Sequence, residues 1–212
     1  MRSAAIVLRP MSASRLVLLA LFALLAAGCG ERPKLERLPE NAVVLAFGDS
    51  LTFGIGANED ESYPAHLEKL IGRRVVRAGV PGEVTAQALA RLPATLDEYQ
   101  PRLLLLCIGG NDFLRRLDMR QAENNVRAMV KLARSRGVGV VLIGTPEPGF
   151  TLSPPGFYAA IAKEFRVPYD AAAVRDVLKD ENLKSDPIHP NARGYRVIAE
   201  RLADALKKGG AI

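Results

Sequence analysis

Hydrophobic runs and helix-like patterns alternate along most of the chain. Three almost uninterrupted apolar runs, which are typical of strands buried on both faces of a sheet, span residues 42–47, 102–108 and 138–143. Two shorter segments, 74–78 and 167–170, are predicted to be further strands.

Between these strands, apolar residues recur at helical spacing. The predicted helices cover residues 62–71, 84–92, 118–136, 157–165, 171–179 and 191–208. Asp118 and Gln121 form a capping box, and Asn191 is the expected cap of the last helix. Because strands and helices alternate, the sequence predicts one α/β domain whose parallel sheet is covered by helices on both faces. Ligands of such sheets bind beyond the carboxyl ends of the strands.

The first 28 residues follow a different pattern. They contain three arginines and no acidic residue, and residues 16–27 are an unbroken apolar run. As a helix this run spans about 18 Å, which is shorter than the ~30 Å hydrocarbon core of a bilayer. The pattern therefore predicts a secretory signal rather than a membrane-spanning helix.

The end of this segment, Leu25-Ala26-Ala27-Gly28-Cys29, resembles a bacterial lipobox. The resemblance implies that Cys29 is lipidated and becomes the mature N-terminus, so that the protein is anchored to a membrane and faces the periplasm. Gly30 favours the outer membrane. An ordinary signal peptide with an incidental cysteine is the alternative, and Met11 is an alternative start. The expected division is signal peptide 1–28, tether 29–40, catalytic domain 41–208 and tail 209–212.

Composition adds few constraints. The net charge of +6 falls to +3 without the first 28 residues, because 26 basic residues then face 23 acidic ones. Nucleic acid is therefore not an expected partner. Two cysteines exclude a disulfide-stapled scaffold, and two histidines exclude a histidine-rich metal site. No metal or cofactor is expected, and Cys107 lies in an apolar strand as a predicted core residue.

Polar residues that could take part in catalysis lie at the ends of predicted strands and in the last loop. Four segments carry them: Gly48-Asp49-Ser50-Leu51, Gly79 to Gly82, Gly109-Gly110-Asn111-Asp112 and Ser185 to Pro190. Together they offer a hydroxyl, an imidazole, a carboxylate and several amide donors. This set suits acyl transfer through a covalent intermediate.

The same segments carry a family resemblance. The strings are G-D-S-L-T at 48–52, A-G-V-P-G-E at 78–83, L-A-R-L-P at 89–93, G-G-N-D at 109–112 and S-D-P-I-H-P-N at 185–191. With them the chain resembles the SGNH (GDSL-type) hydrolases, in particular the thioesterase I, lysophospholipase L1 and arylesterase branch. The resemblance implies a three-layer α/β/α, flavodoxin-like fold with a mainly five-stranded parallel sheet.

The resemblance also implies roles for five residues. Ser50 would be the nucleophile, His189 the base and Asp186 the carboxylate that orients the imidazole. The amides of Ser50 and Gly82 and the side chain of Asn111 would form the oxyanion hole. These residue types fit the chemistry, because a serine needs a base near neutral pH and a developing oxyanion needs neutral donors.

A plainer alternative is that these residues only form turns and loops, which applies to Ser50, Asn111 and His189. The other histidine, His66, lies on a predicted helix and is expected to be structural, so His189 is the candidate base. Asp49 is expected to bond loop amides, and Asp112 to brace the loop of Asn111. Gly79 is expected to be a packing glycine.

The resemblance is weakest between residues 144 and 185, where the chain is more polar than the thioesterases. Phe150, Leu152, Phe157 and Tyr158 either line a short acyl groove or pack this loop on the sheet. The expected enzyme is a monomeric serine esterase for short or medium acyl or aryl esters, with lysophospholipids or acyl thioesters as further substrates. A carbohydrate O-acetyl esterase of the cell envelope and a non-catalytic envelope lipoprotein are the alternatives.

Overall fold

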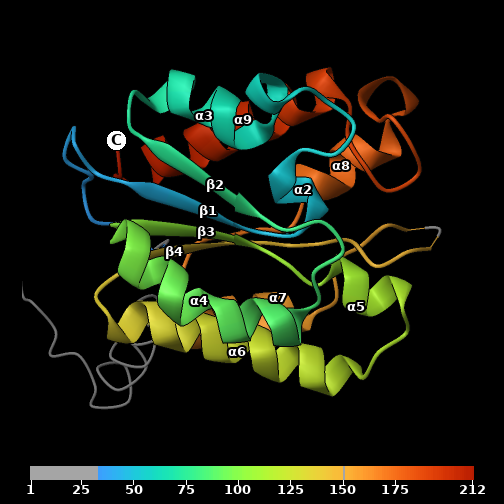
Figure 1. Cartoon of the computed structure of the whole chain (residues 1–212), viewed down its shortest axis with the longest axis horizontal. Coiled ribbons are helices and arrows are strands. Elements are labelled where there is room, and N and C mark those ends of the chain that lie inside the picture. The colour runs from blue at the N-terminus through green and yellow to red at the C-terminus, as the bar shows by residue number, and fades with distance from the viewer. Residues whose placement is uncertain (1–32, 150) are drawn as a thin grey trace, which may run out of the picture. The chain divides into compact units, whose positions relative to one another are not determined.

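A sheet of five parallel strands runs through the structure, a computed structural model that describes residues 33–149 and 151–212 (Figure 1). The strands are β1 (Val44–Gly48), β2 (Val75–Gly79), β3 (Leu103–Cys107), β4 (Gly139–Ile143) and β5 (Tyr169–Asp170). Their order across the sheet is β2-β1-β3-β4-β5. The predicted α/β fold with a five-stranded parallel sheet is confirmed. The predicted signal peptide, Cys29 and Phe150 lie outside the described residues.

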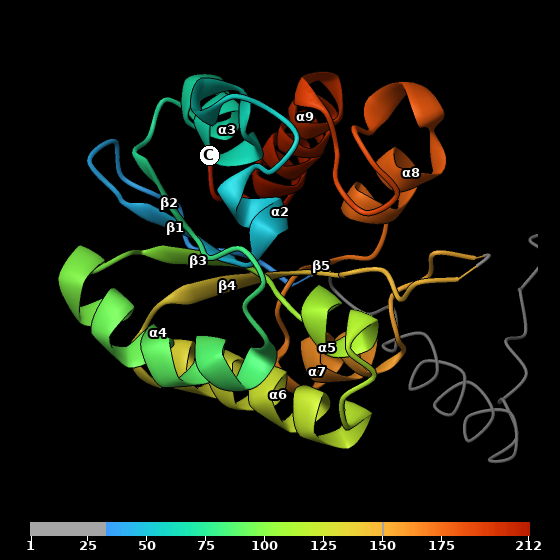
Figure 2. The ribbon, with the colours of Figure 1, turned by 45° about the vertical axis from the view of Figure 1, so that its right-hand side comes forward.

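Helices cover both faces of the sheet, as Figure 2 shows. One layer holds α2 (Ser50–Phe53), α3 (Tyr63–Ile71), α8 (Ala173–Lys179) and α9 (Ala192–Lys208). The other layer holds α4 (Thr85–Tyr99), α5 (Gly110–Leu114), α6 (Met119–Ser135) and α7 (Phe157–Phe165). Two short 3₁₀ helices, η1 (Glu59–Glu61) and η2 (Glu181–Leu183), complete the described chain. None of the described helices has the length and apolar character needed to cross a membrane.

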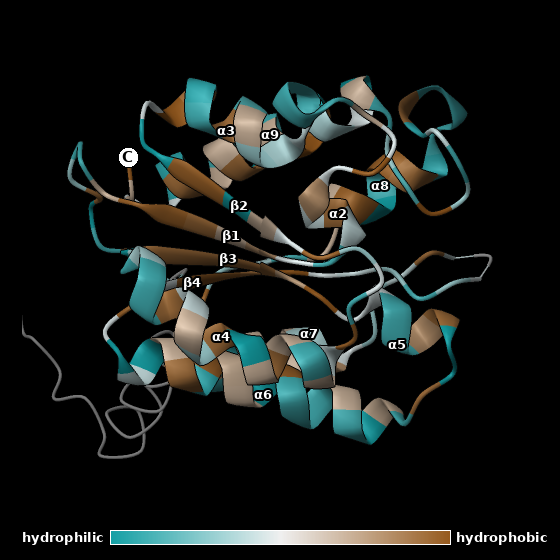
Figure 3. Ribbon diagram, in the orientation of Figure 1, coloured by the Kyte–Doolittle hydropathy of each residue, from teal (hydrophilic) through white to brown (hydrophobic). Residues whose placement is uncertain are grey.

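Two hydrophobic cores lie on opposite faces of the sheet. Side chains alternate between the faces of a strand, so Val44 and Ala46 enter the core under α3 and α9, while Leu45 and Phe47 enter the core over α4 and α6. All residues of β1 and β3 are buried. This explains the unbroken apolar runs of these strands, which Figure 3 shows in brown between helices with polar outer faces.

The helix α4 differs most from the prediction. It continues through Pro93 to Tyr99 rather than ending at residue 92. A proline inside a helix removes one backbone hydrogen bond. The second half of α4 nevertheless buries Thr95 and Leu96, and Leu96 lies in the core. This packing keeps the helix intact.

The terminal segments also differ from the predicted division. The Leu35 amide donates to the Gly209 carbonyl at 2.9 Å, and the Leu38 amide donates to the Ala211 carbonyl at 2.8 Å. The side chains of Leu38 and Ala211 are buried in the core. The predicted tether to residue 40 and tail from 209 are therefore wrong for these residues. Their apolar side chains gain more from burial in the domain than from exposure to water.

The order of the strands creates a crevice at one edge of the sheet. The chain passes from β1 outward to β2 and then returns to β3 on the other side of β1. The connections that leave β1 and β3 therefore diverge at the carboxyl ends of these two strands. Ligands of open α/β sheets bind at such a point.

Candidate active site

Ser50 follows the carboxyl end of β1 and is the first residue of α2. The preceding residue, Asp49, caps this helix, and its Oδ1 accepts a hydrogen bond from the Leu51 amide at 3.1 Å. Asp49 is thus structural as predicted, but the amide that it bonds belongs to α2 rather than to a loop. A short helix after a buried strand gives the Ser50 hydroxyl a defined place at the crevice.

The loop before α9 brings an imidazole to this hydroxyl. His189 Nε2 lies 2.9 Å from Ser50 Oγ, although 139 positions separate the two residues in the sequence. His189 Nδ1 lies 2.7 Å from Asp186 Oδ2. An imidazole protonated on Nδ1 donates to the carboxylate and leaves Nε2 free to accept the serine proton.

Backbone hydrogen bonds fix Asp186 in this geometry. Its Oδ1 accepts from the amides of Ile188 at 2.8 Å and His189 at 2.9 Å. Partial burial acts to raise the pKa of Asp186, but the hydrogen bonds from His189 and Ile188 outweigh it and hold the pKa below its usual value. Asp186 therefore stays ionised while it faces the imidazole.

A tight turn after β2 lies beside the same crevice. The Glu83 amide donates to the Val80 carbonyl at 3.1 Å, and Gly82 has a φ of 77° at the third position. This left-handed conformation at the third position defines a type II turn, which requires glycine. A side chain at Gly79 would lie 2.2 Å from the Phe53 amide nitrogen, so Gly79 is a packing glycine as predicted.

Hydrogen bonds tie this turn to α5. Asn111 Nδ2 donates to the Glu83 carbonyl at 3.0 Å, and Arg115 Nη2 donates to the Gly82 carbonyl at 2.7 Å. The amides of Ser50 and Gly82 donate to no protein acceptor within residues 33–149 and 151–212. Ser50 and Asn111 line the pocket described below, whereas Gly82 is not among its lining residues, so the role of the Gly82 amide in an oxyanion hole stays a prediction.

Hydrogen bonds among polar groups hold the turn after β2 and the loop of Asn111 in place. Asp112 accepts from the Thr85 amide at 2.9 Å and from the Thr85 hydroxyl at 2.7 Å, which ties the loop of α5 to α4. Asn125 donates to the same hydroxyl at 3.0 Å. Arg91 holds the Glu83 carboxylate in a two-point contact at 2.9 and 2.7 Å. Asp112 thus braces this loop, as predicted, whereas the partners Arg91 and Asn125 were not predicted.

A small pocket opens beside Ser50 and His189. Its volume of about 50 Å³ leaves room for a few water molecules or a short acyl group. Its lining is mainly apolar and includes Leu51, Leu114, Thr145, Pro146, Pro148, Leu152, Leu178, Pro187 and Ile188. Among the described residues, no group of three or more metal-ligating side chains is placed to hold an ion.

Of the three described residues of the predicted acyl groove, one lines the pocket and the other two follow the packing alternative. Leu152 lines the pocket, whereas Tyr158 is fully buried and its hydroxyl donates to the Ile108 carbonyl at 2.7 Å. Phe157 stacks on Tyr158 at a ring distance of 4.3 Å and also lies away from the pocket. Both rings pack α7 against the sheet. The pocket lining could have been predicted in part from Ile188, because this apolar residue lies between Asp186 and His189 in the sequence.

A buried carboxyl group next to Ser50 predicts an unusual dependence of stability on pH. The pKa of Asp49 is raised from 3.8 to about 7, chiefly by burial; the Leu51 amide acts to lower it, and the carboxylates of Glu83 and Asp112 act to raise it. Between about pH 4 and 7, Asp49 therefore keeps its proton in the native state and loses it in the unfolded state. Stability from this group is present below pH 4 and is lost as the pH rises through 7.

We expect Asp49→Asn to gain stability relative to the wild type as the pH rises from 4 to 8, by several degrees in melting temperature. The measurement is thermal unfolding of both proteins across this range. Asp97→Asn, at an exposed ion pair with Arg136, is the control and should show no such trend. Parallel curves for Asp49→Asn and the wild type would contradict the raised pKa.

Comparison with known proteins matches residues 46–197 to a family described as the GDSL-like lipase/acylhydrolase family. "Thioesterase 1/protease 1/lysophospholipase L1" of Escherichia coli (strain K12) is 32% identical over 172 residues, which cover 77% of this chain and 83% of that protein. "Esterase TesA" of Pseudomonas aeruginosa is 30% identical over 198 residues, which cover 87% and 98%. A crystal structure of TesA has a TM-score of 0.71 at 28% identity and covers 79% of this chain and 99% of that chain.

Proposed function

Since the chain belongs to the GDSL-like lipase/acylhydrolase family and is a carboxylic ester hydrolase, we propose that it cleaves its substrate through an acyl-enzyme intermediate on Ser50. The observation that carries this proposal is the line of contacts from Ser50 Oγ to His189 Nε2 at 2.9 Å and from His189 Nδ1 to Asp186 at 2.7 Å. A hydroxyl, a base and an orienting carboxylate in this order are the parts of a serine hydrolase.

In the proposed first step, Ser50 Oγ attacks the ester carbonyl carbon while His189 Nε2 takes the hydroxyl proton. The carbonyl oxygen becomes an oxyanion, and the Ser50 and Gly82 amides with Asn111 Nδ2 stabilise it. His189 then gives its proton to the leaving alkoxide or aryloxide as the carbon–oxygen bond breaks. The acyl group remains on Ser50.

In the second step, a water molecule replaces the alcohol. His189 takes a proton from the water, whose oxygen attacks the acyl carbon and forms a second oxyanion in the same place. When this intermediate collapses, the proton returns to Ser50 Oγ and the carboxylic acid leaves. Asp186 stays ionised throughout and stabilises the imidazolium ion in both steps.

The pocket supports short or medium acyl groups as the preferred substrates. Its volume near Ser50 is about 50 Å³, and the two aromatic rings that would have extended it, Phe157 and Tyr158, pack elsewhere. The same two steps can cleave aryl esters, lysophospholipids and acyl thioesters, provided that a short acyl chain lies in this pocket. The small volume equally favours an acetyl group, so deacetylation of O-acetylated carbohydrate is the second candidate.

Chain-length dependence tests the substrate proposal. We expect kcat/KM for p-nitrophenyl esters to be highest between two and eight carbons and to fall for sixteen carbons, since the pocket near Ser50 is small. The measurement is hydrolysis of an ester series by the processed protein, with covalent labelling by a fluorophosphonate to count active sites. A single optimum at sixteen carbons without turnover of short esters would contradict the proposal. Activity on acetyl esters alone would favour the deacetylase.

We also propose that Cys29 is acylated and holds the enzyme at a bacterial membrane on the periplasmic side. The support is the sequence that precedes it, Leu25 to Gly28, together with the basic and apolar segment before that. Several acyl chains on one residue give stable anchoring. Mass spectrometry of the N-terminal peptide after expression in a bacterium tests this, and an unmodified chain that begins elsewhere would exclude it.

A further inference from the structure

The two ends of the sheet differ in what they carry. At the carboxyl edge, where the strands end, lie Ser50, His189 and the pocket. At the amino edge, where the strands begin, the chain enters the domain: Leu35 pairs with Gly209, directly after the end of α9. Figure 1 shows the C-terminus at this edge, and α2, α5 and α8 at the opposite edge.

The length of helix α9 gives the distance between the two edges. It begins at Ala192, three residues after His189, and ends at Lys208, beside the partner of Leu35. Its 17 residues span about 25 Å at 1.5 Å per residue. The six residues from Cys29 to Leu35 span at most about 22 Å when fully extended.

These two lengths restrict how an anchored enzyme faces its membrane. If the carboxyl edge were pressed against the bilayer with α9 upright, Leu35 would be held about the length of α9 above the surface. The segment from Cys29 cannot bridge that height. An anchored domain that stands upright therefore cannot place its pocket directly on the lipid surface that holds Cys29.

The amino edge has the charge of a surface that rests on anionic lipid. Its exposed cationic side chains line two shallow hollows and the last turn of α9, and we call this set the amino-edge face: Lys34, Arg102, Arg134, Arg136, Lys207 and Lys208. Two acidic side chains lie among them, Glu36 and Asp97, each paired with one arginine. The other exposed charges nearby balance, two arginines, Arg37 and Arg74, against two glutamates, Glu40 and Glu98. An excess of cations close to a lipid anchor strengthens binding to anionic headgroups.

We propose that the protein sits on its membrane with the amino-edge face against anionic headgroups and the carboxyl edge pointing away. The ester then reaches Ser50 from the aqueous side and is not a lipid of the leaflet that holds the anchor. This inference rests on the proposed acylation of Cys29.

The carboxyl edge itself carries exposed apolar and basic groups. Leu114 and Ile188 line the pocket and are 44% and 39% exposed, and Arg116, two residues after Leu114, is also exposed. Such groups also suit a lipid surface, but the short segment from Cys29 keeps them off the anchoring bilayer. They are free to contact the acyl or head group of a substrate that arrives from the other side.

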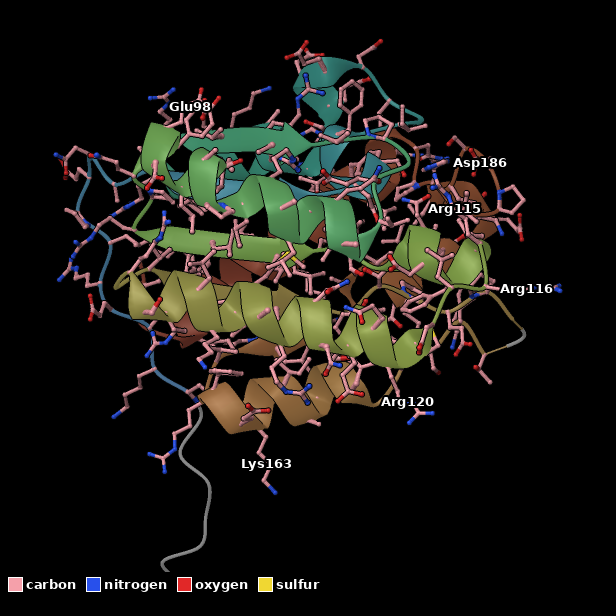
Figure 4. All side chains as sticks on the ribbon, turned by 60° about the horizontal axis from the view of Figure 1, so that its bottom comes forward. Glu98, Arg115, Arg116, Arg120, Lys163 and Asp186 are labelled. Carbon is pink, nitrogen blue, oxygen red and sulfur yellow. The ribbon has the colours of Figure 1, made fainter. Side chains whose placement is uncertain are left out.

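Two fluorescent probes test the orientation. Glu98, at the end of α4, and Arg120, at the start of α6, lie at opposite ends of the domain and are both exposed (Figure 4). The full acylated chain, as Glu98→Cys or Arg120→Cys, is labelled and placed in phosphatidylglycerol and phosphatidylethanolamine vesicles with a nitroxide on the headgroups. We expect the probe at position 98 to be quenched at least about twofold more than the probe at 120.

Charge variants separate the contribution of the amino-edge face to the orientation from that of the lipid anchor. Lys34→Glu with Arg134→Glu should reduce the difference between the probes, whereas the matched pair Arg116→Glu with Lys163→Glu should leave it unchanged. Equal quenching of both probes, or stronger quenching at position 120, would overturn the orientation. Mass spectrometry of the same samples reports acylation, so a chain without acyl groups overturns the anchor and, with it, the orientation, while esterase activity stands apart.

Discussion

Ser50→Ala should lower kcat/KM for p-nitrophenyl esters by at least about 10⁴-fold while the protein stays folded. The hydroxyl is the only part of the proposed machinery that forms a bond to the substrate. Its removal leaves His189 without the proton that it accepts at 2.9 Å, and the oxyanion donors without an attacking group in place. Residual activity would come only from direct attack of water on the bound ester.

The stability of this variant should change little. Ser50 Oγ contacts His189 at the surface of the crevice, and the cap of α2 belongs to Asp49 rather than to Ser50. Thermal unfolding and circular dichroism check the fold, and loss of fluorophosphonate labelling checks the site. Ser135→Ala, on the exposed end of α6, is the matched control and should keep full activity. Half of the wild-type rate in Ser50→Ala would show that another residue is the nucleophile.

Asp186→Asn should lower kcat/KM by about 10³–10⁴-fold. The side-chain oxygen of Asn can still accept from the amides of Ile188 and His189, so the loop should keep its shape. The new amide group faces His189 Nδ1 as a donor, however, and draws the ring proton to Nε2. An imidazole in that form donates to Ser50 and cannot accept its proton.

The readout that separates this role from a structural one is the pH profile. In the wild type, kcat/KM should fall as the pH is lowered, because a protonated His189 cannot act as a base. In Asp186→Asn the remaining activity should rise toward high pH, where hydroxide takes over from the base. Asp180→Asn, which caps η2 and does not touch His189, is the matched control. Wild-type activity in Asp186→Asn would mean that the carboxylate does not orient the ring.

The elements were largely predictable from the sequence because each rests on a local pattern. The last helix, α9, begins after Asn191 and ends at Lys208 as predicted, since its cap and its apolar spacing agree. The buried strands were predictable for the same reason. Short helices were not: α2 and α5 have four and five residues, too few for a periodic pattern, and their position at the end of a strand stabilises them.

The residue types of the candidate site were also visible in the sequence, because Ser50 and Asn111 follow buried strands directly and Asp186 and His189 lie in the loop before the last helix. Their mutual geometry was not. Ser50 and His189 meet across 139 positions, and the bracing contacts of Asp112 with Thr85 join residues 27 positions apart. Distances of this kind depend on how the whole sheet and its helices pack.

The sequence by itself thus determined the alternation of strands and helices, the family resemblance and the candidate chemistry, since these are properties of residue type and spacing. Only the tertiary structure decided which side chains line the pocket: it buried Tyr158 in the core and left Ile188 beside His189. It also decided that Leu38 and Ala211 belong to the domain. The hydrophobic effect is non-directional and depends on how much apolar area leaves water. The sequence alone therefore does not decide whether an apolar residue lies in a groove, in the core or in a tether, and the space left by the packed elements decides it.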